Sequence, residues 1–333
     1  MVTYKKVLIL LLTPVVIYFI GPRVGFQPID PKSPSIDMPL TELDKWIAAK
    51  ESSVSDLKSN NEAKIIWNDS LPQKTKFAVV YLHGFSASWM EGDPVNRNFA
   101  KRYGCNLYLS RLEDHGRRDS NSFITLTPDN FYESAQQALN IGRLLGDSII
   151  LMSCSTGSTL SIMLASQYPE IHSFIMLSPN IDIKDPMSAL TIGPWGSQLT
   201  SLVLGSDYNH ITYTAEAQKY WNPVYHKNGI FTTKKIIADH MNEKSFASIS
   251  QPLFMSYYYK DEDHQDDVVS VPRMLDFYEQ VATRESKKRK YASTTADSHV
   301  IASGIQSKDW EGVQKACYDF AEQVLKLSPV VSK

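Results

Sequence analysis

The side chains best suited to chemistry lie in a short run of small residues between an apolar segment and a helical pattern. Ser153, Ser155 and Gly157 follow the apolar run at 148–152 and precede the helical pattern at 158–167. This context is typical of the G-x-S-x-G turn, which is so tight that the residues flanking its central serine must be small. Ser155 is therefore the candidate nucleophile, with serine at 153 in place of the first glycine. A Ser/Thr-rich helix N-cap is the alternative interpretation.

A second motif, His83-Gly84-Phe85, ends the apolar run at 77–82. In hydrolases with such a serine turn, the N–H after His-Gly and the N–H after the nucleophile form an oxyanion hole. The expected donors are therefore the backbone N–H groups of Phe85 and Thr156. We expect His83 itself to have a structural role in the loop.

The candidate base is a histidine, because a neutral imidazole can accept the proton of a serine near pH 7. In hydrolases of this type the serine, the acid and the histidine follow one another along the chain. Of the six histidines after Ser155, only His299 comes after a late strand, which is predicted at 291–294. The others precede a strand or lie in the 181–250 segment or in an acidic loop: His172, His210, His226, His240 and His264.

The acid is expected in the loop after the strand predicted at 253–259. This loop contains five carboxylates: Asp261, Glu262, Asp263, Asp266 and Asp267. The glycine and glutamate that a calcium-binding EF-hand loop requires are missing, so no metal site is expected. The apolar residues at 268–269 would anchor the chain after Asp266, which favours Asp266 as the acid. Asp263 and Asp267 remain alternatives.

The elements that must position these residues follow an α/β pattern. After residue 40, apolar runs alternate with amphipathic segments, which indicates a mostly parallel sheet flanked by helices. We expect strands at 77–82, 106–109, 148–152, 174–177, 253–259 and 291–294. We expect helices at 131–145, 158–167, 272–281 and 310–325. The aromatic-rich segment at 181–250 is too long for one crossover, so it predicts a cap inserted over the sheet.

The N-terminal segment predicts the location of the protein. Two lysines at 5–6 precede an apolar stretch at 7–20, which as a helix would span roughly 21 Å of a hydrocarbon core about 30 Å thick. No small-residue cleavage site follows, so an uncleaved membrane anchor at 1–25 is favoured over a cleaved signal peptide or a buried helix. The lysines place the N-terminus inside. The catalytic domain would then lie outside the cytoplasm, on the periplasmic side in a bacterium, or would be secreted after cleavage. The prolines within 26–42 predict an extended tether.

Composition excludes several classes of protein. The chain has 333 residues, of which 43% are hydrophobic and 21% charged, so it is not intrinsically disordered. The net charge is −2, without the basic excess of a nucleic-acid-binding protein, and no nucleic-acid partner is expected. The three cysteines have neither metal-ligand spacing nor the number that a disulfide framework needs.

The combined motifs resemble the α/β-hydrolase family, in particular its branch of monoacylglycerol lipases, lysophospholipases and serine aminopeptidases. The matching motifs occur in the expected order over about residues 64–325: His83-Gly84-Phe85, Asp114-His115-Gly116, Ser153-x-Ser155-x-Gly157, Asp266-Asp267-Val268-Val269 and Ser298-His299-Val300. The resemblance implies a triad of Ser155, Asp266 and His299, no metal or organic cofactor, and a cap after the sixth strand. The expected hydrolase core is 43–180 with 251–328, and the expected cap is 181–250.

These observations predict a membrane-tethered serine hydrolase that cleaves carboxylic esters, with small or lipid-like esters as substrates. One alternative is a serine aminopeptidase, whose acidic pocket for a substrate amino group could use Asp207, Glu216 or Asp239. A second alternative is a hydrolase fold without activity that serves as a binding module.

Overall fold

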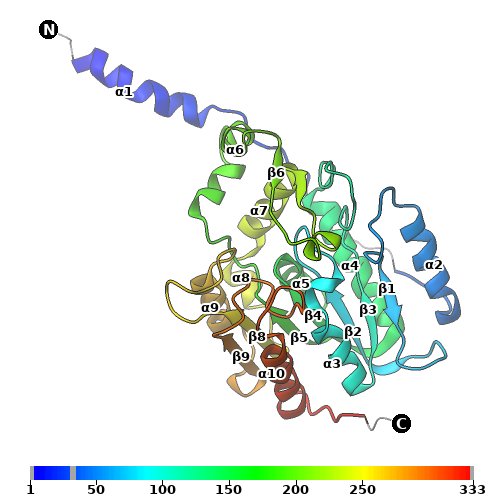
Figure 1. Cartoon of the computed structure of the whole chain (residues 1–333). Helices are drawn as coiled ribbons and strands as arrows, with labels where there is room; N and C mark the ends of the chain where they lie inside the picture. Colours follow the sequence, from blue (N-terminus) through cyan, green and yellow to red (C-terminus); the bar gives the residue numbers. More distant parts are fainter. Residues whose placement is uncertain (1–3, 31–34, 331–333) are drawn as a thin grey trace.

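A seven-stranded sheet forms the centre of the computed structural model, which describes residues 4–30 and 35–330 (Figure 1). Neighbouring strands are parallel, except that β1 pairs antiparallel with β3 at one edge. The order across the sheet is β1 (Lys64–Ile66), β3 (Asn106–Leu109), β2 (Thr75–Leu82), β4 (Gly146–Cys154), β5 (Ile171–Leu177), β8 (Leu253–Tyr258) and β9 (Lys288–Ser293). All six expected strands are therefore present, and β1 is additional.

Alternate residues of the strands pack against helices on opposite faces of the sheet, as the two-residue period of a strand requires. In β2, Val79 and Tyr81 belong to the cluster formed with α3 and α10, whereas Ala78 and Val80 belong to the cluster formed with α4, α5 and α9. The bounds of these helices are α3 (Val95–Tyr103), α4 (Pro128–Leu145), α5 (Thr156–Gln167), α9 (Val271–Gln280) and α10 (Trp310–Gln323). Both faces are covered, which explains why the central strands are continuously apolar.

The segment between β5 and β8 departs from the strand–helix alternation. Figure 1 shows α6, β6 and α7 together at one end of the sheet. The segment contains η2 (Pro186–Ile192), α6 (Gly196–Leu204), β6 (Tyr208–His210), η3 (Ala217–Lys219), β7 (Val224–His226), α7 (Asn228–His240) and α8 (Glu243–Phe246). It follows the fifth strand and not the sixth as expected, because a single short strand, β1, precedes β2 in the described chain. The cap boundaries at 181 and 250 stay a prediction.

The N-terminal residues form α1 (Tyr4–Phe19), which extends away from the sheet in Figure 1. Its end is tied to the 181–250 segment, because the indole Nε1 of Trp195 donates to Ile17 O at 3.0 Å and the Trp195 N–H donates to Pro22 O at 2.7 Å. Within residues 4–30 and 35–330, we find no helix that combines the length and the apolar character needed to cross a bilayer.

The tether expected at 26–42 ends earlier than expected, because α2 (Leu40–Ser52) begins at Leu40. Pro39 occupies the N-cap position of α2, so the last proline of the stretch precedes the helix and does not interrupt it. Leu43 and Ile47 are the buried residues of α2 and join the core on the α4 side of the sheet. The remaining short elements are η1 (Trp89–Gly92) and η4 (Glu285–Lys287).

Candidate active site

Ser155 lies on a strained turn between β4 and α5. Its backbone has φ of 50° and ψ of −123°, a conformation that residues with a side chain rarely adopt. A Cβ at Gly157 would collide with the carbonyl oxygen of Leu82 and come within 2.7 Å of that of His83, so this position requires glycine. The serine at 153 is accommodated because its buried Oγ lies 3.0 Å from Ser158 Oγ.

Three side chains form a continuous hydrogen-bonded chain at this turn. Ser155 Oγ lies 2.8 Å from His299 Nε2, and His299 Nδ1 lies 2.6 Å from Asp266 Oδ2. The other carboxylate oxygen of Asp266 accepts from the N–H groups of Val268 at 2.9 Å and Val269 at 3.0 Å. The residues meet because they follow β4, β8 and β9, which are parallel and end at the same edge of the sheet.

The structure distinguishes among the carboxylates of the loop after β8. Asp266 is fully buried and contacts His299, whereas Asp263 and Asp267 are exposed. The backbone N–H of Asp263 bonds to Asp261 at 3.1 Å, and Asp267 lines the cavity described below without a bond to His299. Of the three candidate acids, the structure brings Asp266 alone into contact with the imidazole. Of the two valines expected to anchor the chain in the core, Val269 is buried, whereas Val268 is 47% exposed.

The environment of His299 favours its protonated form. Burial opposes protonation, but the negative charge of Asp266 and its hydrogen bond, followed by the charges of Glu91 and Asp267, raise the pKa of His299 above its usual 6.5. A hydroxyl at Nε2 and a carboxylate at Nδ1 are the partners that a general base needs on its two sides. The arrangement can therefore take a proton from Ser155 Oγ and stabilise the resulting imidazolium.

The two expected oxyanion donors also lie at this site. Phe85 and Thr156 line the same cavity as Ser155. The N–H of Thr156 begins α5, so the helix supplies no acceptor for it, and no described residue accepts a hydrogen bond from the N–H of Phe85. Two N–H groups beside a serine hydroxyl suit a negatively charged oxygen.

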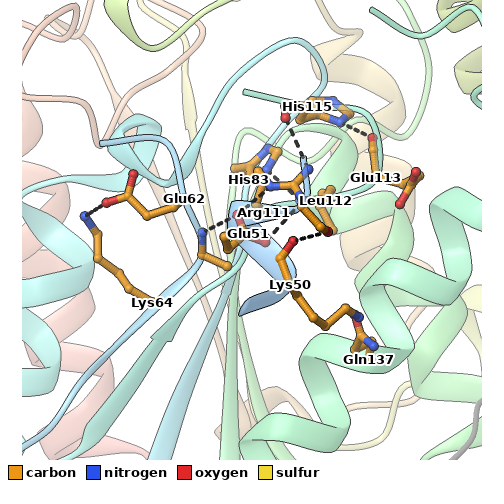
Figure 2. A network of polar contacts seen from close by, with 12 residues as sticks. Lys50, Glu51, Glu62, Lys64, His83, Arg111, Leu112, Glu113, His115 and Gln137 are labelled. Atoms are coloured by element: carbon orange, nitrogen blue, oxygen red, sulfur yellow. Dashed lines mark hydrogen bonds and ion pairs between the residues drawn. The ribbon is translucent and has the colours of Figure 1, made fainter. Parts of the chain in front are cut away.

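His83 holds the turn that carries Phe85. Its Nε2 accepts from the Leu112 N–H at 3.1 Å, so the proton is on Nδ1, which donates to the Gly84 carbonyl at 2.8 Å. Burial lowers the pKa of His83 to about 4 and keeps the ring neutral. Figure 2 shows this ring beside a network in which Arg111 pairs with Glu51, with Nε 2.6 Å from Oε2.

Comparison with known proteins supports this geometry at the level of the fold. No protein-family model and no curated protein matches the chain. Among solved structures, one reported for the metagenome-derived lipolytic enzymes LipS and LipT has a TM-score of 0.64 at 18% identity, and the alignment covers 79% of this chain and 98% of that one. The monoacylglycerol lipase of Paleococcus ferrophilus gives a TM-score of 0.54 at 12% identity, and the alignment covers 78% of this chain and 96% of that one. Est1E of Butyrivibrio proteoclasticus, with ferulic acid bound, gives a TM-score of 0.54 at 14% identity, and the alignment covers 80% of this chain and 95% of that one.

The chain has the α/β-hydrolase fold. In this α/β-hydrolase fold the serine turn follows β4, which lies between β2 and β5 in the sheet. The expected fold class is thereby confirmed for the sheet and its helices.

A cavity opens in front of Ser155 in this α/β-hydrolase fold. Its volume is about 680 Å³, and most of its wall comes from the 181–250 segment. Apolar lining residues include Ile183, Leu190, Leu199, Ile211, Tyr213 and Trp221. The charged lining residues are Glu91, Asp185, Asp267 and Asp297, and the described wall contains no lysine or arginine. The cavity therefore suits an apolar group without negative charge.

Two polar residues of this site were not predicted from the sequence. The backbone N–H of Asn180 donates to Ser155 O at 3.1 Å, and its side-chain Nδ2 donates to Thr156 Oγ1 at 3.2 Å, so Asn180 braces the serine turn. Glu91 Oε2 accepts from the Gly84 N–H at 2.5 Å. The position of Asn180 just after a strand next to β4 was a usable signal. For Glu91, the sequence offered one weak signal, namely that it is the single acidic residue of the short segment 89–92.

The described part of the chain offers no group of three or more His, Cys, Asp or Glu side chains that could hold a metal ion. Cys105, Cys154 and Cys317 are free thiols and are buried. Burial raises the pKa of each of these thiols, so they are poor nucleophiles.

Proposed function

We propose that this protein is a serine hydrolase that cleaves carboxylic esters through an acyl-enzyme, with Ser155 as nucleophile, His299 as base and Asp266 as acid. The observation that carries the proposal is the hydrogen-bonded chain from Ser155 Oγ through both ring nitrogens of His299 to the buried Asp266, with contacts of 2.8 and 2.6 Å. The solved structures of similar fold are reported as lipases and esterases, which supports an ester substrate.

The reaction follows from the positions of these groups. Ser155 Oγ attacks the carbonyl carbon of the ester while its proton moves to His299 Nε2, and Asp266 stabilises the imidazolium. The N–H groups of Phe85 and Thr156 bind the tetrahedral oxyanion, and each such donor lowers the barrier by roughly 2.7–4 kcal/mol. The alcohol leaves with the proton from His299. Water, deprotonated by the same imidazole, then attacks the acyl-enzyme and releases the acid.

The cavity defines the substrate class. Its apolar wall would hold an acyl chain or aryl group, and its acidic residues, which no lysine or arginine of the described wall offsets, would disfavour an anionic ester. We therefore expect neutral, apolar or lipid-like esters to react faster than esters that carry a carboxylate or phosphate.

The aminopeptidase alternative lacks support from the residues expected to bind an amino group. Each is already paired with a lysine: Asp207 with Lys227 at 2.6 Å, Glu216 with Lys219 at 2.5 Å and Asp239 with Lys235 at 2.8 Å. None of the three carboxylates lines the cavity. Parallel assays with p-nitrophenyl esters and aminoacyl naphthylamides separate the two activities, and we expect hydrolysis of the esters.

Labelling with a fluorophosphonate probe tests the proposed nucleophile. The intact protein should be labelled, and Ser155→Ala should abolish labelling. Ser153→Ala should retain most of it, because the Ser153 hydroxyl faces Ser158 and not His299. Absence of labelling in the folded wild-type protein would favour the non-catalytic binding module, and loss of labelling in the Ser153 variant alone would assign the nucleophile to Ser153.

We further propose that residues 1–25 attach the protein to a membrane and leave the hydrolase outside the cytoplasm. The support is the set of apolar side chains that α1 and the residue after it expose: Leu11, Leu12, Val15, Val16, Ile17, Phe19 and Ile20. Sequencing the N-terminus of the protein from the membrane fraction would distinguish an intact anchor from a cleaved signal.

A further inference from the structure

Glu91 is a buried carboxylate that the proposed reaction does not use. It lies in η1, is 2% exposed, and lines the cavity together with Ser155 and His299. Within residues 4–30 and 35–330, no lysine or arginine forms an ion pair with it. Burying a carboxylate without a cation costs stability, so its presence here calls for a physical reason.

The groups that interact with Glu91 come from several elements, and they include Tyr213 of the 181–250 segment, on whose hydroxyl the charge of Glu91 acts. Its Oε2 accepts from the Gly84 N–H, Tyr81 approaches it from β2, and Cys154 approaches it from β4. The cationic group whose charge acts on it is His299, when that ring is protonated. Burial raises the pKa of Glu91 to about 7, although the Gly84 bond and the charge of His299 oppose the rise.

We propose that Glu91 is a positioning residue that fixes the Gly84–Phe85 turn through the Gly84 N–H and acts on His299 through its charge. This inference rests on the proposed function, because it assigns Glu91 to the same reaction.

The geometry of the turn explains the first role. Glu91 holds the Gly84 N–H at 2.5 Å, and His83 Nδ1 holds the Gly84 carbonyl at 2.8 Å. These two groups belong to successive peptide units, and each unit is planar. Fixing both units fixes the backbone of Gly84 and with it the Phe85 N–H, which shares its plane with the Gly84 carbonyl and belongs to a residue that lines the cavity. A Cβ at Gly84 would lie 2.7 Å from Glu91 Oε1 and 2.9 Å from Ser155 Cβ, which shows how closely the three residues pack.

The electrostatics explain the second role. Asp266, Glu91 and Asp267 all favour the protonated form of His299, and of these Glu91 and Asp266 are buried, where solvent screens their charges little. Glu91 and His299 therefore titrate as a coupled pair in the free enzyme. Removing the charge of Glu91 without removing its oxygen should leave His299 easier to deprotonate.

Two substitutions separate these roles. Glu91→Gln keeps an oxygen that can accept from the Gly84 N–H but removes the charge, and Glu91→Ala removes both. We expect the plateau kcat of Glu91→Gln to stay within about threefold of wild type, while the acid limb of its kcat/KM profile moves to lower pH by about 0.5 unit or more and becomes steeper, because His299 then titrates as a single group. We expect Glu91→Ala to lower kcat by roughly 10- to 100-fold with a smaller change in KM, because an oxyanion donor is misplaced. Glu133→Gln, an exposed glutamate on α4, is the matched control and should change neither quantity.

The outcomes distinguish this inference from the proposed function. A wild-type protein that neither reacts with a fluorophosphonate nor hydrolyses esters contradicts the function itself. An active wild type whose acid limb is unchanged in Glu91→Gln overturns the inference, as does full activity of Glu91→Ala. Thermal unfolding of each variant shows whether it is folded, and the isosteric Glu91→Gln decides the test alone if Glu91→Ala does not fold.

Discussion

At the scale of single residues, both carboxylate oxygens of Asp266 are hydrogen-bonded. One oxygen faces His299 and the other receives two backbone N–H groups, while the side chain is fully buried. From the sequence, Asp266 could be favoured as the acid, but Asp263 and Asp267 could not be excluded. All three have the same chemistry, and only the fold determines which one is buried. Glu91 was not predicted for the same reason. Its carboxylate accepts from the backbone N–H of Gly84, and a motif of side chains does not reveal such a contact.

Asp266→Asn is expected to lower kcat by about 10³- to 10⁴-fold, because the amide cannot stabilise the imidazolium and allows the wrong tautomer of His299. Steady-state hydrolysis of a p-nitrophenyl ester measures the effect. Asp263→Asn, at an exposed position of the same loop, should stay close to wild type. Comparable losses in both variants would contradict the assignment of Asp266.

At the scale of elements, the serine turn depends on how closely α5 approaches β2. The first turn of α5 contains Gly157, which packs on the backbone at the end of β2. We expect Gly157→Ala to lower the free energy of unfolding by about 2 kcal/mol or more and to reduce ester hydrolysis, because the new methyl group pushes the helix away from the strand. Gly25→Ala, whose Cβ meets no atom within 4 Å, is the control for chemical denaturation and should be neutral. An equally stable and active Gly157 variant would show that the turn tolerates a side chain.

His83 joins the ends of two strands, since it follows β2 and binds the backbone of Leu112 beyond β3. Its pKa is lowered to about 4 in the folded protein, so the unfolded chain binds the proton more readily. The stability that the neutral ring provides is therefore complete above about pH 6.5 and is lost as the pH falls toward 4, by roughly 3 kcal/mol. Urea unfolding of wild type and His83→Asn over this range should give a flatter pH dependence for the variant. Parallel curves would contradict this role.

The strands and helices of the core were predictable to a large extent, because apolar runs buried on both faces of a sheet differ clearly from amphipathic helices. Strand β1 was missed, since three residues at an edge with exposed Ile66 carry no such pattern. The sixth strand before the 181–250 segment was expected from the family resemblance, and the structure has five there because β1 alone precedes β2 in the described chain. Asn180 was missed because its role comes from backbone contacts with Ser155 that only the folded chain creates.

At the scale of the whole molecule, α1 extends away from the sheet, and its end is bound to the 181–250 segment by the two hydrogen bonds that Trp195 donates to Ile17 O and Pro22 O. The proposed catalytic side chains all lie after residue 150, and neither Ile17 nor Pro22 contributes to the triad. Deleting residues 1–25 should therefore leave the kcat for a short soluble ester within about twofold of wild type while abolishing sedimentation with phospholipid vesicles. Sedimentation and ester hydrolysis by the same preparation provide the measurement. Retention of the truncated protein on vesicles would show that another surface binds the lipid.

The order of strands across the sheet has a consequence for how activity is lost. β4, which leads to the proposed nucleophile Ser155, is hydrogen-bonded on both sides, whereas β9, which leads to the loop of His299, borders the sheet and pairs with β8 alone. Border strands fray at lower cost than interior ones. On gradual heating, the enzyme should therefore lose its activity while most of its backbone amides are still protected from deuterium exchange. The hydroxyl of Ser155 would still be in place when the imidazole of His299 has already moved away from it.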